Sequence, residues 1–166
     1  NIKDGEEGRH KLLDHPVVPD LDVDVGLLHD KAVYQQRGFR SIQATGRPFV
    51  IHKVATTLDG HTACEGGDSR WITSEPARKA VHRLRAACDA IVVGVGTVIA
   101  DDPELTVRSV SLPSGRQPQV VVFDRTLRMP LSARIARPGT IVVTMAAAPK
   151  TSMAALQSKG CHILTL

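Results

Sequence analysis

Three short apolar runs limit what this chain can fold into more than any other feature. They are AIVVGV at 90–95, QVVVF at 119–123 and TIVVT at 140–144. Their apolar side chains follow one another without polar alternation, which is typical of parallel strands buried on both faces. Because a helical pattern precedes the first run and another follows the third, we expect an α/β domain with a largely parallel sheet. The end of the chain, 161–166, has a weaker strand pattern.

The longest helix is predicted for residues 74–88. Thr73 or Ser74 is the candidate N-cap, and Glu75 and Pro76 suit a first turn, which tolerates a carboxylate and a missing N–H. Helical spacing defines a stripe that we expect to be buried, namely Ala77, Ala80, Val81 and Leu84. The basic residues fall on another face and are expected to form a ridge, namely Arg78, His82 and Arg85.

The segment PFVIHKVATT at 48–57 has the pattern of a further strand. Lys53 lies in this apolar run and is expected to be partly buried, where a lysine needs a partner. The breaker Gly46-Arg47-Pro48 precedes it. We therefore place a domain boundary between residues 1–45, which carry a modest helical pattern at 27–39, and the main domain at 46–166.

Composition excludes several classes of protein. Aromatic residues make up 3% of the chain, which disfavours single-stranded nucleic-acid binding, and the net charge of +4 favours anionic partners without choosing among them. Cys64, Cys88 and Cys161 form no C-x-x-C pair, so we expect neither a disulfide framework nor a structural metal site. Free cysteines fit a cytosolic protein, and no apolar run is long enough to span a membrane.

Four features are candidates for chemistry, and each has a purely structural alternative. The Gly94–Gly96 turn could approach a phosphate or be an ordinary strand-to-helix turn. Asp101-Asp102 could hold a ligand or form an Asx turn before Pro103. Arg85 and Arg108, with Lys53, could bind phosphate or be solvated charges. Trp71 could cover a flat ring or fill a core.

Taken in order, these features resemble one family. The runs GRPFVIHKVATTLDG and GGDSRWITSEPARKAVHRLRAACDAIVVGVGTVIADDPELTVR closely resemble the reductase domain of the bifunctional riboflavin-biosynthesis deaminase/reductase. The resemblance is dense over 46–108 and continues more loosely to the end of the chain. It implies a dihydrofolate-reductase-like three-layer fold with a mainly parallel sheet. It also implies reduction of 5-amino-6-(5-phosphoribosylamino)uracil by NADPH, with hydride delivered to C1′ of the opened sugar.

The resemblance also implies roles for individual residues. As substrate ligands it indicates Ser69, Arg85, Leu105 and Arg108, of which the serine and the two arginines would gather the ribose phosphate. As NADPH contacts it indicates Ala55, Trp71, Thr97 and Asp101. Lys53, with Asp101, is expected to act in catalysis by polarising the substrate or relaying a proton. No metal and no nucleic acid are implied, and pairing into a homo-oligomer is expected because relatives of this fold commonly pair.

Residues 1–45 resemble the tail of the family's deaminase domain and its linker. The family's Glu-Gly-Gly-type loop is not present before Leu166, so we expect a chain that is incomplete at both ends and contains part of the reductase site. On that basis the piece alone is not expected to be fully active. Two alternatives remain: a non-catalytic remnant or interaction domain of the same fold, and a reductase of a related pyrimidine or pterin.

Overall fold

The computed structural model describes residues 24, 26–67, 72–112 and 115–166. The chain divides into two compact units, Asn1–Val54 and Ala55–Leu166. The division falls within the predicted main domain, so the boundary expected after residue 45 stays a prediction. Within the described ranges, no helix is both long enough and apolar enough to cross a membrane.

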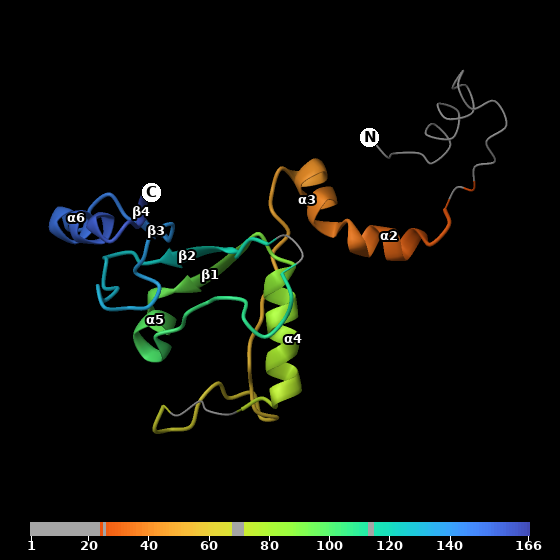
Figure 1. The fold of residues 1–166 in the computed structure, drawn as a ribbon, viewed down its shortest axis with the longest axis horizontal. Coiled ribbons are helices and arrows are strands. Elements are labelled where there is room, and N and C mark those ends of the chain that lie inside the picture. Colours follow the sequence, from red (N-terminus) through yellow and green to blue (C-terminus); the bar gives the residue numbers. More distant parts are fainter. Residues whose placement is uncertain (1–23, 25, 68–71, 113–114) are drawn as a thin grey trace, which may run out of the picture. The chain divides into compact units, whose positions relative to one another are not determined.

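The larger unit contains a four-stranded sheet in the order β1-β2-β3-β4 (Figure 1). Its elements in chain order are α4 Glu75–Ala86, β1 Ala90–Gly94, α5 Val95–Asp101, β2 Gln119–Phe123, β3 Ile141–Thr144, α6 Lys150–Ser158 and β4 His162–Thr165. All three strand pairings are parallel. The three apolar runs and the weaker C-terminal run therefore form the strands that the sequence predicts, and the α/β class is confirmed.

One face of the sheet carries the core. Val122 pairs with Val93 on one side and Val142 on the other, so the three side chains share a face. Val122 and Val142 are fully buried, and the same cluster includes Val98 of α5 and Leu156 of α6. Helices α5 and α6 thus cover this face, and burying an aliphatic side chain of this size contributes about 1.5–3 kcal/mol.

The opposite face differs from the prediction. Val92, Phe123 and Leu164 lie on it and are 54%, 53% and 52% exposed. The strands were expected to be buried on both faces, but the described residues cover this one only in part: Val143, which pairs with Phe123 and Leu164, is 6% exposed. The reason is that both α5 and α6 pack into the same core cluster, which leaves these apolar side chains without a covering layer.

Helix α4 begins as predicted, and its predicted stripe is buried only in part, with Ala77, Val81 and Leu84 half-buried. The Ser74 side chain accepts a hydrogen bond from the Ala77 backbone N–H, as an N-cap does. His82 is the buried residue of this helix, whereas Ala80 of the predicted stripe is exposed. The basic ridge packs against the segment that follows α5 instead of facing solvent, since Arg85 donates to the Thr106 carbonyl oxygen.

The strand predicted at 48–57 does not form. These residues have no secondary structure, and Val50 is 78% exposed. Lys53 is also exposed, so its predicted partial burial is wrong. A strand requires a hydrogen-bonding neighbour, and no described strand pairs with this segment; an apolar pattern alone cannot supply one.

The smaller unit contains α2 His29–Gln35 and α3 Arg37–Thr45. The predicted helical pattern at 27–39 is thus real but is interrupted at Gln36 and continues further. Gly46 ends α3 with a left-handed φ of 68°, which glycine adopts without steric cost. Arg37 stacks on the Tyr34 ring, with 4.2 Å from its guanidinium carbon to the ring centroid.

Gly160, between α6 and β4, is required by both conformation and space. Its φ is 83°, and a Cβ added there would lie 2.9 Å from the Pro138 Cα. Gly139 has a similar φ of 86° but open space around it. We expect Gly160→Ala to lower the free energy of unfolding by about 1–3 kcal/mol, and by more than the matched Gly139→Ala. Urea denaturation of both variants measures the difference, and equal losses of unfolding free energy would contradict the steric clash with Pro138.

Candidate active site

The segment 102–108, which follows α5, is held in place by side chains from distant parts of the chain. Gln117 makes both backbone hydrogen bonds of Val107, accepting from its N–H at 2.7 Å and donating to its carbonyl oxygen at 2.9 Å. Arg137 Nη2 donates to the Glu104 carbonyl oxygen at 3.2 Å. These side chains supply the hydrogen bonds that a neighbouring strand would supply in a sheet, because backbone polar groups removed from water need partners.

Arg85 and Arg108 meet at Thr106. Arg85 Nη1 donates to the Thr106 carbonyl oxygen at 3.3 Å, and Arg108 Nη1 lies 3.5 Å from Thr106 Oγ1. Arg85 is partly buried, and burial together with the nearby Arg108 lowers the pKa of its guanidinium below the ordinary value. The group remains a cation at neutral pH. Two arginines 23 positions apart in the sequence therefore place positive charge around one residue.

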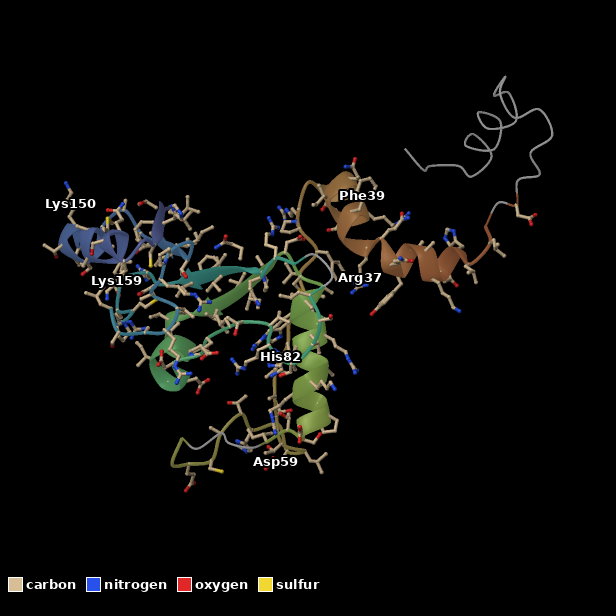
Figure 2. All side chains as sticks on the ribbon, viewed as in Figure 1. Arg37, Phe39, Asp59, His82, Lys150 and Lys159 are labelled. Atoms are coloured by element: carbon tan, nitrogen blue, oxygen red, sulfur yellow. The ribbon has the colours of Figure 1, made fainter. Side chains whose placement is uncertain are left out.

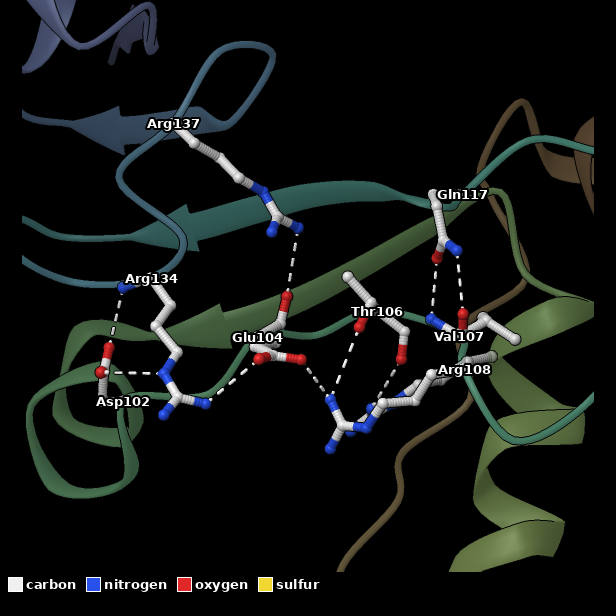
Figure 3. Close-up of polar contacts among 9 residues, drawn as sticks. Asp102, Glu104, Thr106, Val107, Arg108, Gln117, Arg134 and Arg137 are labelled. Atoms are coloured by element: carbon white, nitrogen blue, oxygen red, sulfur yellow. Dashed lines mark hydrogen bonds and ion pairs between the residues drawn. The ribbon is translucent and has the colours of Figure 1, made fainter.

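Two carboxylates surround this cluster (Figure 3). Glu104 contacts Arg108 through Oε2 at 2.6 Å and Arg134 through Oε1 at 3.2 Å. Asp102 contacts Arg134 at 3.4 Å and also accepts from the Arg134 backbone N–H at 2.8 Å. These ion pairs are half-exposed and each contributes about 0–1 kcal/mol, so their main effect is to orient Arg108 and to join two loops.

The backbone of the same segment is unusual. Leu105 has φ 53° and Asp102 has φ 38°, in the left-handed region that non-glycine residues seldom adopt. The Leu105 side chain is 5% exposed and belongs to the core cluster. Its burial holds the strained backbone in place, and such conformations cluster at functional sites.

His82 is a residue of α4 (Figure 2), and its imidazole is close enough to Arg85, Arg108 and Thr106 for each to act on its pKa. It is 8% exposed, and its Nδ1 is buried without a hydrogen-bond partner. Burial lowers the pKa of the imidazole, and the positive charges of Arg85 and Arg108 lower it further, while a hydrogen bond to the Thr106 backbone raises it. The imidazole is therefore neutral at pH 7.

A second group of predicted residues lies where β1 passes into α5. Gly94 ends the strand, and Thr97 and Asp101 are exposed on the helix. Gly94 and Gly96 have ordinary φ angles, and a Cβ added to either would meet nothing within 4 Å. The fold itself therefore does not require glycine at these two positions, and the turn is open on its outer side.

The structure brings together some of the predicted site residues and leaves others apart. Arg85, Leu105 and Arg108 gather around the 102–108 segment. Asp101 adjoins that segment, but the ion pair with Arg134 is made by its neighbour Asp102. Other predicted residues have no described contact to this cluster. Lys53 belongs to the smaller unit, and Ala55 lies in an irregular, half-buried position. Ser69 and Trp71 lie outside the described residues.

The residues that organise the arginines were not among the predicted site residues. Glu104 and Thr106 lie in the family-like run ADDPELTVR without an assigned role, and Gln117 lies outside it. Their roles come from contacts across loops. His82 was identified only as a member of a basic ridge. Its spacing of three residues from Arg85, which puts both on one helix face, was the signal that linked it to the site.

The fold and this cluster define a class of protein. The structure is similar to Acinetobacter baumannii RibD, form 1, with a TM-score of 0.72 and 38% identity over 88% of this chain and 41% of that one. A deaminase/reductase from Thermotoga maritima matches with a TM-score of 0.63 and 28% identity over 85% of this chain and 45% of that one. The class is the α/β domain with the dihydrofolate-reductase-like fold.

The chain belongs to the RibD C-terminal domain family, whose model matches residues 48–166. It is 40% identical over 88% of its length to the riboflavin biosynthesis protein RibD of Aquifex aeolicus and covers 41% of that protein. It is 50% identical over 56% of its length to the RibD protein of Mycobacterium tuberculosis and covers 27% of that protein. The chain thus spans less than half the length of these relatives.

The neutral buried His82 makes stability depend on pH. Because the folded pKa lies below that of the unfolded chain, the unfolded state binds more protons below about pH 6.5, and stability falls as pH falls. We expect His82→Gln to show a smaller loss of unfolding free energy than the wild type on acidification from about pH 7.5 to 5.5. Urea denaturation in phosphate-free and sulfate-free buffer measures it, with the exposed His162→Gln as control. Parallel pH profiles for wild type and His82→Gln would contradict the expectation.

Proposed function

We propose that this chain provides the substrate-phosphate site and part of the cofactor site of an NADPH-dependent reductase acting on 5-amino-6-(5-phosphoribosylamino)uracil in riboflavin biosynthesis. The observation that carries the proposal is the meeting of Arg85 and Arg108 at Thr106. Membership of the RibD C-terminal domain family supports the reaction class. The free thiols of Cys64, Cys88 and Cys161 fit a reducing cytosolic compartment.

The charge balance of the cluster favours an anion. Arg85, Arg134 and Arg137 contact the 102–108 segment, which itself contains Arg108 and the carboxylates of Asp102 and Glu104. The described ion pairs therefore leave an excess of positive charge. The guanidinium fork matches phosphate oxygens. In the described contacts Arg85 and Arg137 donate to neutral carbonyl oxygens, whereas Arg108 and Arg134 each contact a carboxylate.

The turn from β1 to α5 fits a cofactor that approaches the backbone. In open parallel sheets, ligands bind beyond the carboxyl ends of the strands, and Gly94 is such an end. The open space outside Gly94 and Gly96 would admit the cofactor, with Thr97 and Asp101 as its polar contacts. NADPH supplies the hydride when bound.

The residues of the chain would orient the substrate and supply charge. Arg85 and Arg108, with Ser69, would hold the ribose phosphate, and Leu105 would pack against the substrate, so that C1′ lies at a fixed distance from the hydride donor. Reduction of the C1′=N imine of the opened sugar adds a hydride to carbon and a proton to nitrogen. We assign Lys53, with Asp101, to polarising that bond or relaying the proton.

The phosphate assignment predicts a defect in substrate binding. Arg85→Ala should raise the KM for the phosphoribosylamino-pyrimidine, because a hydrogen bond from a charged donor contributes about 1.5–3 kcal/mol, equivalent to roughly 10–100-fold. The KM for NADPH should change little. NADPH oxidation measured at varied substrate concentration tests this, with exposed Arg83→Ala on the same helix as the control. An unchanged substrate KM would refute the assignment.

The cofactor assignment predicts opposite effects on stability and binding. Gly96→Ala places a methyl group in open space, so the fold should be unchanged or stabilised by up to about 1 kcal/mol through helix propensity. The same methyl group should weaken NADPH binding several-fold if the cofactor approaches the backbone there. Thermal unfolding and NADPH titration of the one variant give the two readouts. Unchanged NADPH affinity would count against the close approach.

A further inference from the structure

His82 and Asp124 are the described residues with a buried side-chain polar atom that lacks a hydrogen-bond partner. Asp124 already has a structural role, since its Oδ2 accepts from the Met129 backbone N–H at 2.7 Å and closes the turn after β2. His82 has no such explanation. It lies one helical turn before Arg85 and against the residues assigned above to phosphate, yet that assignment makes no use of it.

The surroundings of His82 depend on whether an anion is present. The charged groups that act on the imidazole are Arg85 from its own helix and Arg108 from the 102–108 segment, and both are cations. Together with burial they hold it neutral. A dianion bound between the two guanidinium groups would reverse the local field, because opposite charge nearby favours the protonated imidazole.

Thr106 connects His82 with Arg85. The Thr106 carbonyl oxygen accepts from Arg85 Nη1 at 3.3 Å, and the Thr106 backbone raises the pKa of the His82 imidazole. If Arg85 turns toward a bound anion, the imidazole can donate to this carbonyl. The strained segment around Leu105 then stays against α4, and Arg108 stays near Arg85.

We propose that His82 is a positioning residue of the Arg85–Arg108 anion site, and that its imidazole takes up a proton from solvent when a dianion such as a phosphate monoester binds there. The inference deepens the proposed function and rests on its phosphate site. Its consequence is a linkage: a ligand that increases the proton affinity of a group binds more tightly as pH falls. Each unit by which the bound anion raises the pKa of His82 corresponds to about tenfold in affinity.

The test uses inorganic sulfate as the probe, because sulfate remains a dianion across the range in which histidine titrates. Any pH dependence of its binding therefore comes from the protein. Calorimetry on the 166-residue chain should show several-fold tighter binding at about pH 5.5 than at about pH 8. The amide of His82→Gln can still donate to Thr106 but cannot titrate. At the higher pH this variant should bind sulfate within about twofold of wild type, and its affinity should increase less than that of wild type as pH falls. The exposed His162→Gln should retain the full trend.

A second readout does not depend on a variant. The assigned His82 Cε1–H resonance of the wild-type chain should titrate at higher pH with saturating sulfate than without it. An unchanged titration, with sulfate bound in an Arg85-dependent manner, overturns the role of His82 and leaves the phosphate site intact. Sulfate binding that is absent, or that survives Arg85→Ala unchanged, overturns the anion site itself and the phosphate assignment with it.

Discussion

The site depends on how the backbone of the 102–108 segment is satisfied. This segment has no neighbouring strand, so the polar groups that a sheet would pair are paired by the side chains of Gln117, Arg137 and Arg85. A buried backbone group left unpaired costs about 1–3 kcal/mol. The segment therefore keeps its path only while these distant side chains are in place, and its path determines where Arg108 and Leu105 lie.

The contacts that hold the 102–108 segment in place also concentrate positive charge around it. Arg137 and Arg134 hold the loop before β3 to the segment, and Arg85 holds α4 to it. The same guanidinium groups that satisfy backbone and carboxylate oxygens also create the excess positive charge. In the proposed function a substrate phosphate would bind beside Arg85 and His82, so the same residues contribute to stability and to ligand binding.

Membership of the RibD C-terminal domain family and the solved RibD structures agree with the parallel sheet. Two apolar features have no partner among the described residues. The segment at 48–57 has no described strand beside it, and one sheet face exposes Val92, Phe123 and Leu164.

The sequence alone determined the four parallel strands, the start of α4 at Thr73 or Ser74 and the breaker at Gly46, because these follow from local hydrophobicity, hydrogen-bonding chemistry and backbone freedom. The order of motifs was enough to indicate the family. It could not show that residues 48–57 remain unpaired, that Lys53 is exposed, or that His82 rather than Ala80 is buried. Those outcomes depend on which segments pack together. Thr106, Glu104 and Gln117 acquire their roles only through long-range contacts, and such contacts leave no periodic trace in the sequence.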